Sequence, residues 1–312
     1  MTKQILSIDK MLSPQMPMLE DEFDVIRLWR EENPEKTIQT QSHEISAIVS
    51  SLLPVSNSLI EALPNLEIIA NCAVGYDNID LDFCKNRGIA VTNTPDVLTD
   101  DTADVAMLLM LNVLRRSVEG DAYLRAGLWQ SKGPLGLGAS LSGKTLGIVG
   151  LGRIGQAIAQ RAAAFNMTIL YNGPNEKPDR PYIYEKDLIT MAEKSDILLA
   201  VCPGGDATKN LINRDVFNAL GENGFFINVA RGSVVVQDDL LIALSNRNIA
   251  GAGMDVYWNE PTVPAELISM DNVVLTPHIG SATVETRAKM MQITIDNLKA
   301  HFDGKPLITP VI

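Results

Sequence analysis

The chain has 312 residues, of which 46% are hydrophobic, so it can form the core of one large domain or of two domains of ordinary size. Acidic residues outnumber basic residues by 38 to 26, which gives a formal net charge of −12. Because such a surface repels phosphate backbones and anionic lipids, neither nucleic acid nor membrane partners are expected.

The cysteines and the apolar runs exclude further classes of protein. Cys72, Cys84 and Cys202 are scattered, so neither a disulfide framework nor a metal site is expected. Charged residues interrupt the N-terminal apolar run too early for a signal peptide. The longest apolar stretch, residues 105–114, is far shorter than the ~20 residues that span a bilayer. A cytoplasmic protein is therefore expected.

In the first hundred residues, short β-rich runs alternate with helical patterns, which is typical of a parallel sheet covered by helices. The predicted strands are residues 4–8, 47–50, 66–72 and 90–92. The runs 58–62 and 81–87 between them are predicted to be helical. The Thr94-Pro95-Asp96 step ends the last of these strands.

A helix follows over residues 99–116, with apolar side chains around most of its circumference. Such a helix is expected to be buried, here between two domains. Asp100 and Asp101 fall in its first turn, and Arg115 and Arg116 in its last, so the charges complement the helix dipole at both ends.

From Lys144 the alternation of strands and helices restarts, and it continues nearly to the end of the chain. The predicted strands are 145–149, 168–171, 197–201, 225–229, 251–255 and 273–275. A helix is predicted at 154–165 and a last amphipathic helix at 284–302.

A glycine-rich segment, Gly150-Leu151-Gly152-Arg153-Ile154-Gly155, joins the strand at 145–149 to the helix after it. In this context the G-x-G-x-x-G pattern predicts a dinucleotide-binding loop rather than a structural turn without ligand. Gly150 permits the tight turn, Gly152 lets the backbone approach a pyrophosphate, and Gly155 lets the helix pack on the strand. The N–H groups at the helix start would receive the phosphate charge.

The fold class is therefore α/β, with two Rossmann-like, doubly wound parallel sheets and a cleft between the domains. Residues 100–282 are expected to form an NAD(P)-binding Rossmann domain. This domain interrupts a smaller, flavodoxin-like domain made of residues 1–99 and 283–312, which is expected to bind the substrate.

The end of the second Rossmann strand decides between NAD and NADP. An acid about 20 residues after the first glycine usually binds the ribose of NAD, but Asn172 and Gly173 stand here. An Arg for a 2′-phosphate is missing from the strand end as well. Lys177 and Arg180 lie within a few residues and could swing onto such a phosphate, as looser contacts than a fixed Arg, whereas Glu176 could take the ribose hydroxyls instead. The balance favours NADP(H), with NAD(H) possible.

Three polar residues, Arg231, Glu260 and His278, each follow an apolar strand, where ligands of open α/β sheets bind. A histidine can deliver a proton to a carbonyl oxygen, and a carboxylate beside it holds the ring and favours its charged form. A guanidinium can bind a carboxylate in a fork. Singly, they could be a capping histidine, a helix-capping arginine and an exposed turn residue. Together, behind a dinucleotide loop, they predict hydride transfer involving a small 2-oxo or 2-hydroxy acid.

These segments together resemble the D-specific 2-hydroxyacid dehydrogenase family, and within it the glyoxylate/hydroxypyruvate reductases and the hydroxyphenylpyruvate reductases. The matching stretches run nearly from end to end, and they are residues 94–100, 147–156, 228–233 and 277–283. Two positions depart from the family pattern. Pro174 stands where relatives that prefer NADPH often carry Arg, and Lys132 lies near the place of a second Trp in many glyoxylate-reducing relatives.

The resemblance implies that Arg231, Glu260 and His278 are catalytic and that the backbone N–H groups of Val74 and Gly75 hold the substrate carboxylate. It implies a homodimer and a role for Asp255 in bonding the nicotinamide carboxamide. The expected cofactor-binding residues are Thr102, Gly150, Gly152, Arg153, Ile154, Gly155, Asn172, Cys202, Pro203, Val229, Asp255 and Gly280.

Two alternatives stay open at this point. The same fold serves dinucleotide-sensing regulators such as transcriptional corepressors, which need a cofactor site but no turnover; the set of Arg231, Glu260 and His278 favours an enzyme. The other alternative is a dehydrogenase for a different acid, such as phosphoglycerate or formate. The chain ends at Ile312, without the long C-terminal extension of many phosphoglycerate enzymes.

Overall fold

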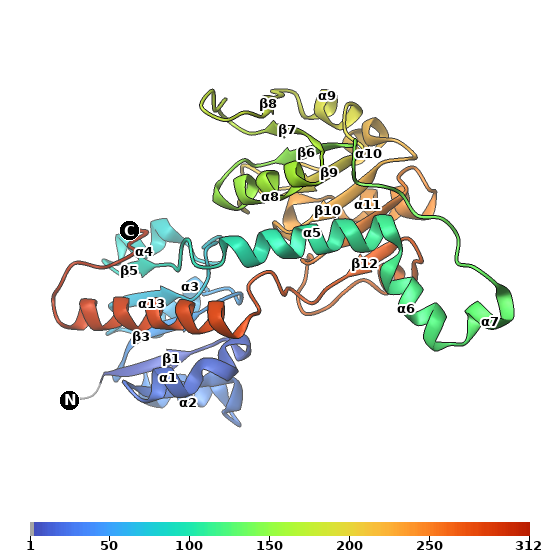
Figure 1. Ribbon diagram of the computed structural model, residues 1–312. Coiled ribbons are helices and arrows are strands. Elements are labelled where there is room, and N and C mark those ends of the chain that lie inside the picture. Colours follow the sequence, from blue (N-terminus) through green and yellow to red (C-terminus); the bar gives the residue numbers. More distant parts are fainter. Residues whose placement is uncertain (1–2) are drawn as a thin grey trace. The chain divides into compact units, whose positions relative to one another are not determined.

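The computed structural model describes residues 3–312, in which two compact units share the chain (Figure 1). One unit combines the segment up to Leu98 with Ala282–Ile312, and the other is Thr99–Ser281. Each unit is built on one parallel sheet flanked by helices. The prediction of two α/β domains with doubly wound parallel sheets is thus confirmed.

The sheet of the first unit has the strand order β2-β1-β3-β4-β5, and every pairing is parallel. Its strands are β1 (Gln4–Ser7), β2 (Asp24–Arg27), β3 (Ile45–Ser50), β4 (Ile68–Asn71) and β5 (Ala90–Thr92). Its α-helices are α1 (Met16–Glu20), α2 (Pro34–Gln41), α3 (Asn57–Glu61), α4 (Leu81–Asn86) and α13 (Val284–Phe302). Because β3 and β4 are buried along their whole length, polar side chains reach the surface only beyond their ends.

The sheet of the second unit has seven parallel strands in the order β12-β11-β10-β9-β6-β7-β8. The strands are β6 (Thr145–Val149), β7 (Thr168–Asn172), β8 (Ile183–Tyr184), β9 (Ile197–Ala200), β10 (Phe225–Asn228), β11 (Gly251–Met254) and β12 (Val273–Leu275). The chain winds outward from β6 in one direction and from β9 in the other. The topological switch point, where such sheets bind ligands, therefore lies between β6 and β9.

Helices cover both faces of this second sheet, and each face has its own apolar core. The helices α5 (Thr99–Arg115) and α8 (Arg153–Ala164) pack on one face, and α9 (Leu188–Glu193), α10 (Arg214–Leu220) and α11 (Gln237–Ser245) pack on the other. The remaining helices are α6 (Ser117–Arg125), α7 (Leu128–Lys132) and α12 (Ala265–Ser269). Helix α5 ends at Arg115 because Arg116 adopts a left-handed φ of +52°.

Most predicted elements are confirmed, and four of them, 90–92, 145–149, 273–275 and 284–302, have the predicted bounds. The other predicted strands and helices begin or end one or two residues away from the predicted positions. The edge strand β2 and the two-residue strand β8 were not predicted. β8 is too short for an alternating pattern to stand out, and β2 fully buries only one of its side chains, so in both cases pairing with a neighbouring strand defines the element.

Among the described residues, no helix is both long enough and apolar enough to cross a membrane.

Candidate active site

The glycine loop between β6 and α8 has the geometry of a pyrophosphate cradle. Gly150 adopts a φ of +103°, and a Cβ there would come within 2.8 Å of the Cys202 backbone. A Cβ on Gly155 would collide with the carbonyl oxygen of Gly150. Gly152 is the N-cap of α8, and in the described part of the chain no atom beyond its two chain neighbours lies within 4 Å of where its Cβ would be. The loop therefore leaves open space beside the N–H groups of the helix start, as a bound pyrophosphate requires.

The other residues predicted to bind the cofactor lie near the same edge of the second unit. Arg153 and Ile154 are the first residues of α8. With one exception, the other positions lie at the end of a strand or after it. These positions are Asn172 at the end of β7, Cys202 and Pro203 after β9, Val229 after β10, Asp255 after β11 and Gly280 after β12. The exception is Thr102 of α5, whose Oγ1 donates a hydrogen bond of 2.9 Å to the carbonyl oxygen of Gly280.

The side chain of Asn172 binds backbone at the end of β7. Its Nδ2 donates to the carbonyl oxygens of Glu185 at 3.0 Å and Lys186 at 2.9 Å. The hydroxyl oxygen of Tyr171 accepts a hydrogen bond of 2.7 Å from the N–H of Lys177, which fixes the start of the loop after the strand. The last residue of β7 is therefore an amide that binds backbone, and the loop after it is held by the Tyr171 hydroxyl. Neither residue is a carboxylate that would repel a 2′-phosphate.

Arg231 lies in the turn after β10, and the fully buried Asn228 shapes this turn. Oδ1 of Asn228 accepts from the N–H of Ala230 at 3.0 Å, and its Nδ2 donates to the carbonyl oxygen of Arg231 at 3.0 Å. Nη1 of Arg231 donates to the carbonyl oxygen of Ala230 at 2.9 Å. One amide side chain thus fixes the backbone from which the guanidinium projects.

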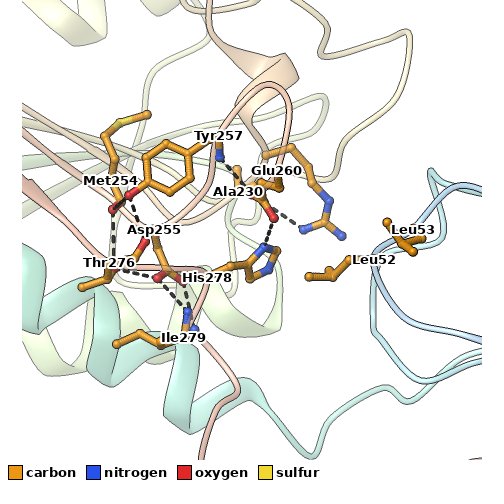
Figure 2. Close-up of polar contacts among 12 residues, drawn as sticks. Leu52, Leu53, Ala230, Met254, Asp255, Tyr257, Glu260, Thr276, His278 and Ile279 are labelled. Carbon is orange, nitrogen blue, oxygen red and sulfur yellow. Dashed lines mark hydrogen bonds and ion pairs between the residues drawn. The ribbon is translucent and has the colours of Figure 1, made fainter. Parts of the chain in front are cut away.

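His278 and Glu260 form a close pair, as Figure 2 shows. Nδ1 of His278 lies 2.7 Å from Oε2 of Glu260, whose Oε1 accepts from the N–H of Tyr257 at 2.9 Å. The side chains are only 19% and 25% exposed, so water screens the pair weakly. His278 also adopts a left-handed φ of +51°, which is unfavourable for a residue with a side chain and has to be held by its surroundings.

The buried carboxylate of Asp255 holds the loop that carries His278 (Figure 2). Its Oδ1 accepts from Oγ1 of Thr276 at 2.6 Å and from the N–H of Ile279 at 2.8 Å, and its Oδ2 accepts from the N–H of Gly280 at 2.9 Å. The main-chain oxygen of Asp255 accepts from the N–H of His278 at 2.9 Å. These bonds fix the backbone on both sides of the histidine.

The pKa values of the two carboxyl groups near His278 are shifted in opposite directions. Burial raises the pKa of Glu260, but the hydrogen bond and charge of His278, together with the Tyr257 N–H and the Arg231 charge, hold that pKa below its ordinary value. Burial also raises the pKa of Asp255, and there it outweighs the hydrogen bonds from the 276–280 loop. Glu260 is therefore ionised at neutral pH, as an imidazole-orienting carboxylate must be.

The turn of Arg231 and the loop of Glu260 touch at Gly232. A Cβ on Gly232 would collide with the main chain of Tyr257 and Trp258, so only glycine allows this approach. The hydroxyl of Tyr257 also donates to the carbonyl oxygen of Thr276 at 2.9 Å, which joins the Glu260 loop to the His278 loop. The three loops after β10, β11 and β12 are thus packed as one layer.

In the first unit, Val74 and Gly75 lie half-buried in the loop after β4. Hydrogen bonds fix the carbonyl oxygens of this loop: Thr94 N–H binds Ala73 at 2.9 Å, Asn93 Nδ2 binds Val74 at 2.9 Å, and Asn71 Nδ2 binds Gly75 at 2.7 Å. Within residues 3–312, the N–H groups of Val74 and Gly75 donate to no acceptor. This loop offers unpaired N–H donors of the kind that bind anions.

The second unit therefore holds an imidazole–carboxylate pair, a guanidinium and a dinucleotide cradle. No group of three or more His, Cys, Asp or Glu side chains in the described part of the chain could hold a metal ion. Such a site can bind a nicotinamide dinucleotide, hold a carboxylate and supply a proton, which are the requirements for reducing an oxo acid.

Sequence reasoning missed the residues that support this site, namely Asn228, Tyr257, Thr276 and the two asparagines Asn71 and Asn93. Asn228 carried a signal, since an asparagine at a strand end three residues before an arginine suits a side-chain-stabilised turn. No sequence signal marks the others, because their partners are distant in the chain or belong to other strands.

Comparisons with known proteins identify the family of the chain. The model of the NAD binding domain of the D-isomer specific 2-hydroxyacid dehydrogenases matches residues 107–280. A glyoxylate/hydroxypyruvate reductase A of Arabidopsis thaliana is 46% identical over 309 residues, covering 97% of this chain and 98% of that protein. A hydroxyphenylpyruvate reductase of Plectranthus scutellarioides is 45% identical over 307 residues, with the same coverage of both chains.

A solved structure is similar over the whole chain as well. It is an NADPH-dependent glyoxylate/hydroxypyruvate reductase of Sinorhizobium meliloti in complex with NADP and malonate, with a TM-score of 0.90 and 40% sequence identity. The similarity covers 100% of this chain and 97% of that one. With its fold, its loop and these relatives in agreement, this chain is an oxidoreductase that belongs to the D-isomer specific 2-hydroxyacid dehydrogenase family.

Proposed function

We propose that this enzyme reduces a small 2-oxo acid, of the glyoxylate/hydroxypyruvate or hydroxyphenylpyruvate type, to the D-2-hydroxy acid with NAD(P)H. The proposal depends above all on the 2.7 Å contact between His278 Nδ1 and Glu260 Oε2, formed on the loops next to Arg231. The relatives named above, which are called reductases of these acids, support the same substrate class.

His278 acts as the general acid in this proposal. Because Glu260 engages Nδ1, Nε2 is the nitrogen that donates a proton to the substrate carbonyl oxygen. The ionised Glu260 orients the ring and stabilises its charge before the transfer. When bound, the reduced nicotinamide supplies a hydride to C2 of the substrate. The products of one turnover are a hydroxy acid, a neutral imidazole and the oxidised dinucleotide.

Arg231 and the loop of Val74 and Gly75 hold the substrate carboxylate in this proposal. A guanidinium binds a carboxylate through two parallel hydrogen bonds and polarises the neighbouring carbonyl. The N–H groups of Val74 and Gly75 supply local donors, which an enzyme with a net charge of −12 needs to bind an anion. The first unit is accordingly proposed to bind the substrate and the second to bind NAD(P).

The pyrophosphate is proposed to bind at the glycine loop, and the other cofactor-binding residues predicted above keep their proposed roles. Three hydrogen bonds already reach the carboxylate of Asp255. A carboxylate has about four lone-pair sites, so its Oδ2 retains one for the carboxamide of the nicotinamide. Asp255 can therefore hold the His278 loop and the cofactor ring together.

NADPH is expected to be preferred over NADH, with NADH tolerated. The end of β7 has no carboxylate to repel a 2′-phosphate, and Lys177 and Arg180 lie in the loop that follows. The measurement is kcat/KM for each cofactor at one fixed oxo-acid concentration. A preference for NADH of tenfold or more, which is about 1.4 kcal/mol in transition-state binding, would contradict this interpretation.

The proposed function itself is tested by following absorbance at 340 nm with a panel of 2-oxo acids from glyoxylate to hydroxyphenylpyruvate, each with NADPH and with NADH. Turnover of at least one acid is expected. Binding of the dinucleotide without turnover of any acid would favour a regulatory protein of the same fold.

Replacing Glu260 with glutamine tests the acid–carboxylate pair through its pH dependence. The pKa of Glu260 lies below its ordinary value, so the carboxylate is ionised throughout the neutral range and is lost only at low pH. Glutamine cannot gain a proton, so the fall in kcat/KM that protonation of Glu260 causes at low pH should be absent from the profile of the variant, and its kcat/KM should lie below that of the wild type at neutral pH because the ring loses its carboxylate. Superimposable pH profiles of the variant and the wild type would argue against the pair.

We also propose a homodimer. Residues 117–141 expose apolar side chains that a second copy could cover, and these are Val118, Leu124, Trp129 and Leu137. Leu137 is the most exposed of the four, at 95%.

A further inference from the structure

Three consecutive peptide units in the loop after β4 are held by their carbonyl oxygens. The first is held by a main-chain N–H, that of Thr94, at 2.9 Å from the oxygen of Ala73. The next two are held by side-chain amides: Asn93 Nδ2 lies 2.9 Å from the oxygen of Val74, and Asn71 Nδ2 lies 2.7 Å from the oxygen of Gly75.

Because a peptide unit is planar, a hydrogen bond that fixes its carbonyl oxygen also fixes the direction of its N–H group. In a trans peptide the C=O of one residue and the N–H of the next point in opposite directions. The N–H groups of Val74, Gly75 and Tyr76 therefore point away from the groups that hold the carbonyls. In the described part of the chain none of the three donates to a protein acceptor. Three N–H groups in succession are thus left available to an anion.

Asn71 is constrained to one orientation. It is 1% exposed at the end of β4, and its Oδ1 is buried without a hydrogen-bond partner. If the amide were flipped, Oδ1 would face the carbonyl oxygen of Gly75, and two acceptors would repel each other. A leucine would avoid the unpaired oxygen, but it would leave the Gly75 carbonyl without this donor. The hydrogen bond to the Gly75 carbonyl oxygen therefore explains why an asparagine stands at position 71.

Asn93 has a fixed base from which to reach the loop. Its N–H donates to the carbonyl oxygen of Thr309 at 3.3 Å, and its own carbonyl oxygen accepts from Oγ1 of Thr309 at 2.6 Å. Its side chain is half-buried and contacts the Val74 oxygen from this position. Removing that side chain thus frees one peptide unit of the loop while the main chain at Asn93 stays held.

We propose that Asn71 and Asn93 are positioning residues that aim the N–H groups of the Val74–Gly75 loop at the substrate carboxylate. This rests on the proposed function, which assigns the carboxylate to these N–H groups. Neither asparagine touches the substrate in this account, and each acts through the peptide unit whose oxygen it holds.

The test compares a 2-oxo acid with its methyl ester, because the ester lacks the carboxylate charge that the loop binds. Values of kcat/KM with NADPH are measured for glyoxylate and methyl glyoxylate in the wild type, Asn93→Ala and Asn71→Ala. Asn65→Ala is the matched control, since Asn65 Nδ2 makes the same kind of bond, 2.7 Å to the carbonyl oxygen of His43, elsewhere in the first unit.

In each loop variant the acid-to-ester ratio of kcat/KM should fall about five- to tenfold, through loss of activity on glyoxylate with the KM for NADPH unchanged. The control should keep the wild-type ratio. A nonspecific loss of structure lowers kcat/KM for the acid and for the ester by the same factor, so the ratio stays unchanged. If Asn71→Ala does not fold, Asn93→Ala decides.

Two outcomes would overturn the proposal, and they show whether the proposed function fails with it. A wild type that prefers glyoxylate, together with an unchanged ratio in Asn93→Ala, would remove the positioning role alone. A wild type that reduces the acid and the ester equally well would remove the carboxylate-binding part of the proposed function as well.

Discussion

Replacing His278 with alanine is expected to lower kcat for 2-oxo-acid reduction by roughly 10²–10⁴-fold, the usual contribution of a positioned general acid. The imidazole is the group paired with Glu260 at 2.7 Å, and its removal leaves the substrate oxygen without that proton donor. The affinity for NADPH should change little, because the glycine loop that is proposed to hold the pyrophosphate begins at another strand of the sheet, β6. The measurements are steady-state kinetics at saturating cofactor and the Kd for NADPH.

The chain supplies a matched control for this variant. His301 also faces a carboxylate, with Nε2 at 3.3 Å from Oε2 of Glu67, but it lies in the last helix of the first unit. His301→Ala therefore removes an imidazole–carboxylate pair without removing the proposed acid, and its kcat should equal that of the wild type. Near-normal turnover of His278→Ala would remove the histidine from the mechanism.

Arg231→Lys is expected to lose kcat/KM for the oxo acid by roughly 10²-fold or more, the scale reported for loss of a preorganised donor to a developing charge. The substitution keeps the positive charge but not the planar fork, and an ammonium cannot reproduce two parallel hydrogen bonds to a carboxylate. Asn228 fixes the backbone beneath the side chain at 3.0 Å, so the turn itself should persist in the variant. NADPH should still bind.

Arg214→Lys is the control for this second experiment. The side chain of Arg214 is 65% exposed and pairs with Asp239 at 3.3 Å in the second unit, and the main-chain N–H of Arg214 also donates to that carboxylate at 2.9 Å. That variant should have wild-type kinetics. Unchanged kcat/KM in Arg231→Lys would mean that the residue acts only through its charge, or not at all.

Much of this protein could be predicted from the sequence because its signals are local. The alternation of apolar strands with helical patterns predicted two parallel-sheet units, and the strands at 145–149 and 273–275 have the predicted bounds. The glycine loop was predictable because Gly150 and Gly155 answer steric demands made by Cys202 after the neighbouring strand β9 and by the Gly150 carbonyl, both close to the loop. Edge strands as short as β8 were not, since only pairing with a neighbour defines them.

The grouping of Arg231, Glu260 and His278 was expected because parallel strands bring their carboxyl ends to one edge of a sheet. The contacts that hold the loops at that edge depend on the tertiary structure alone. Asp255 fixes the His278 loop from another strand, and Gly232 admits the main chain of Tyr257. In the first unit, Asn71 and Asn93 hold neighbouring peptide units of one loop. The sequence determines which groups can react, whereas the direction of an N–H or an imidazole depends on partners that only the folded chain brings within 3 Å.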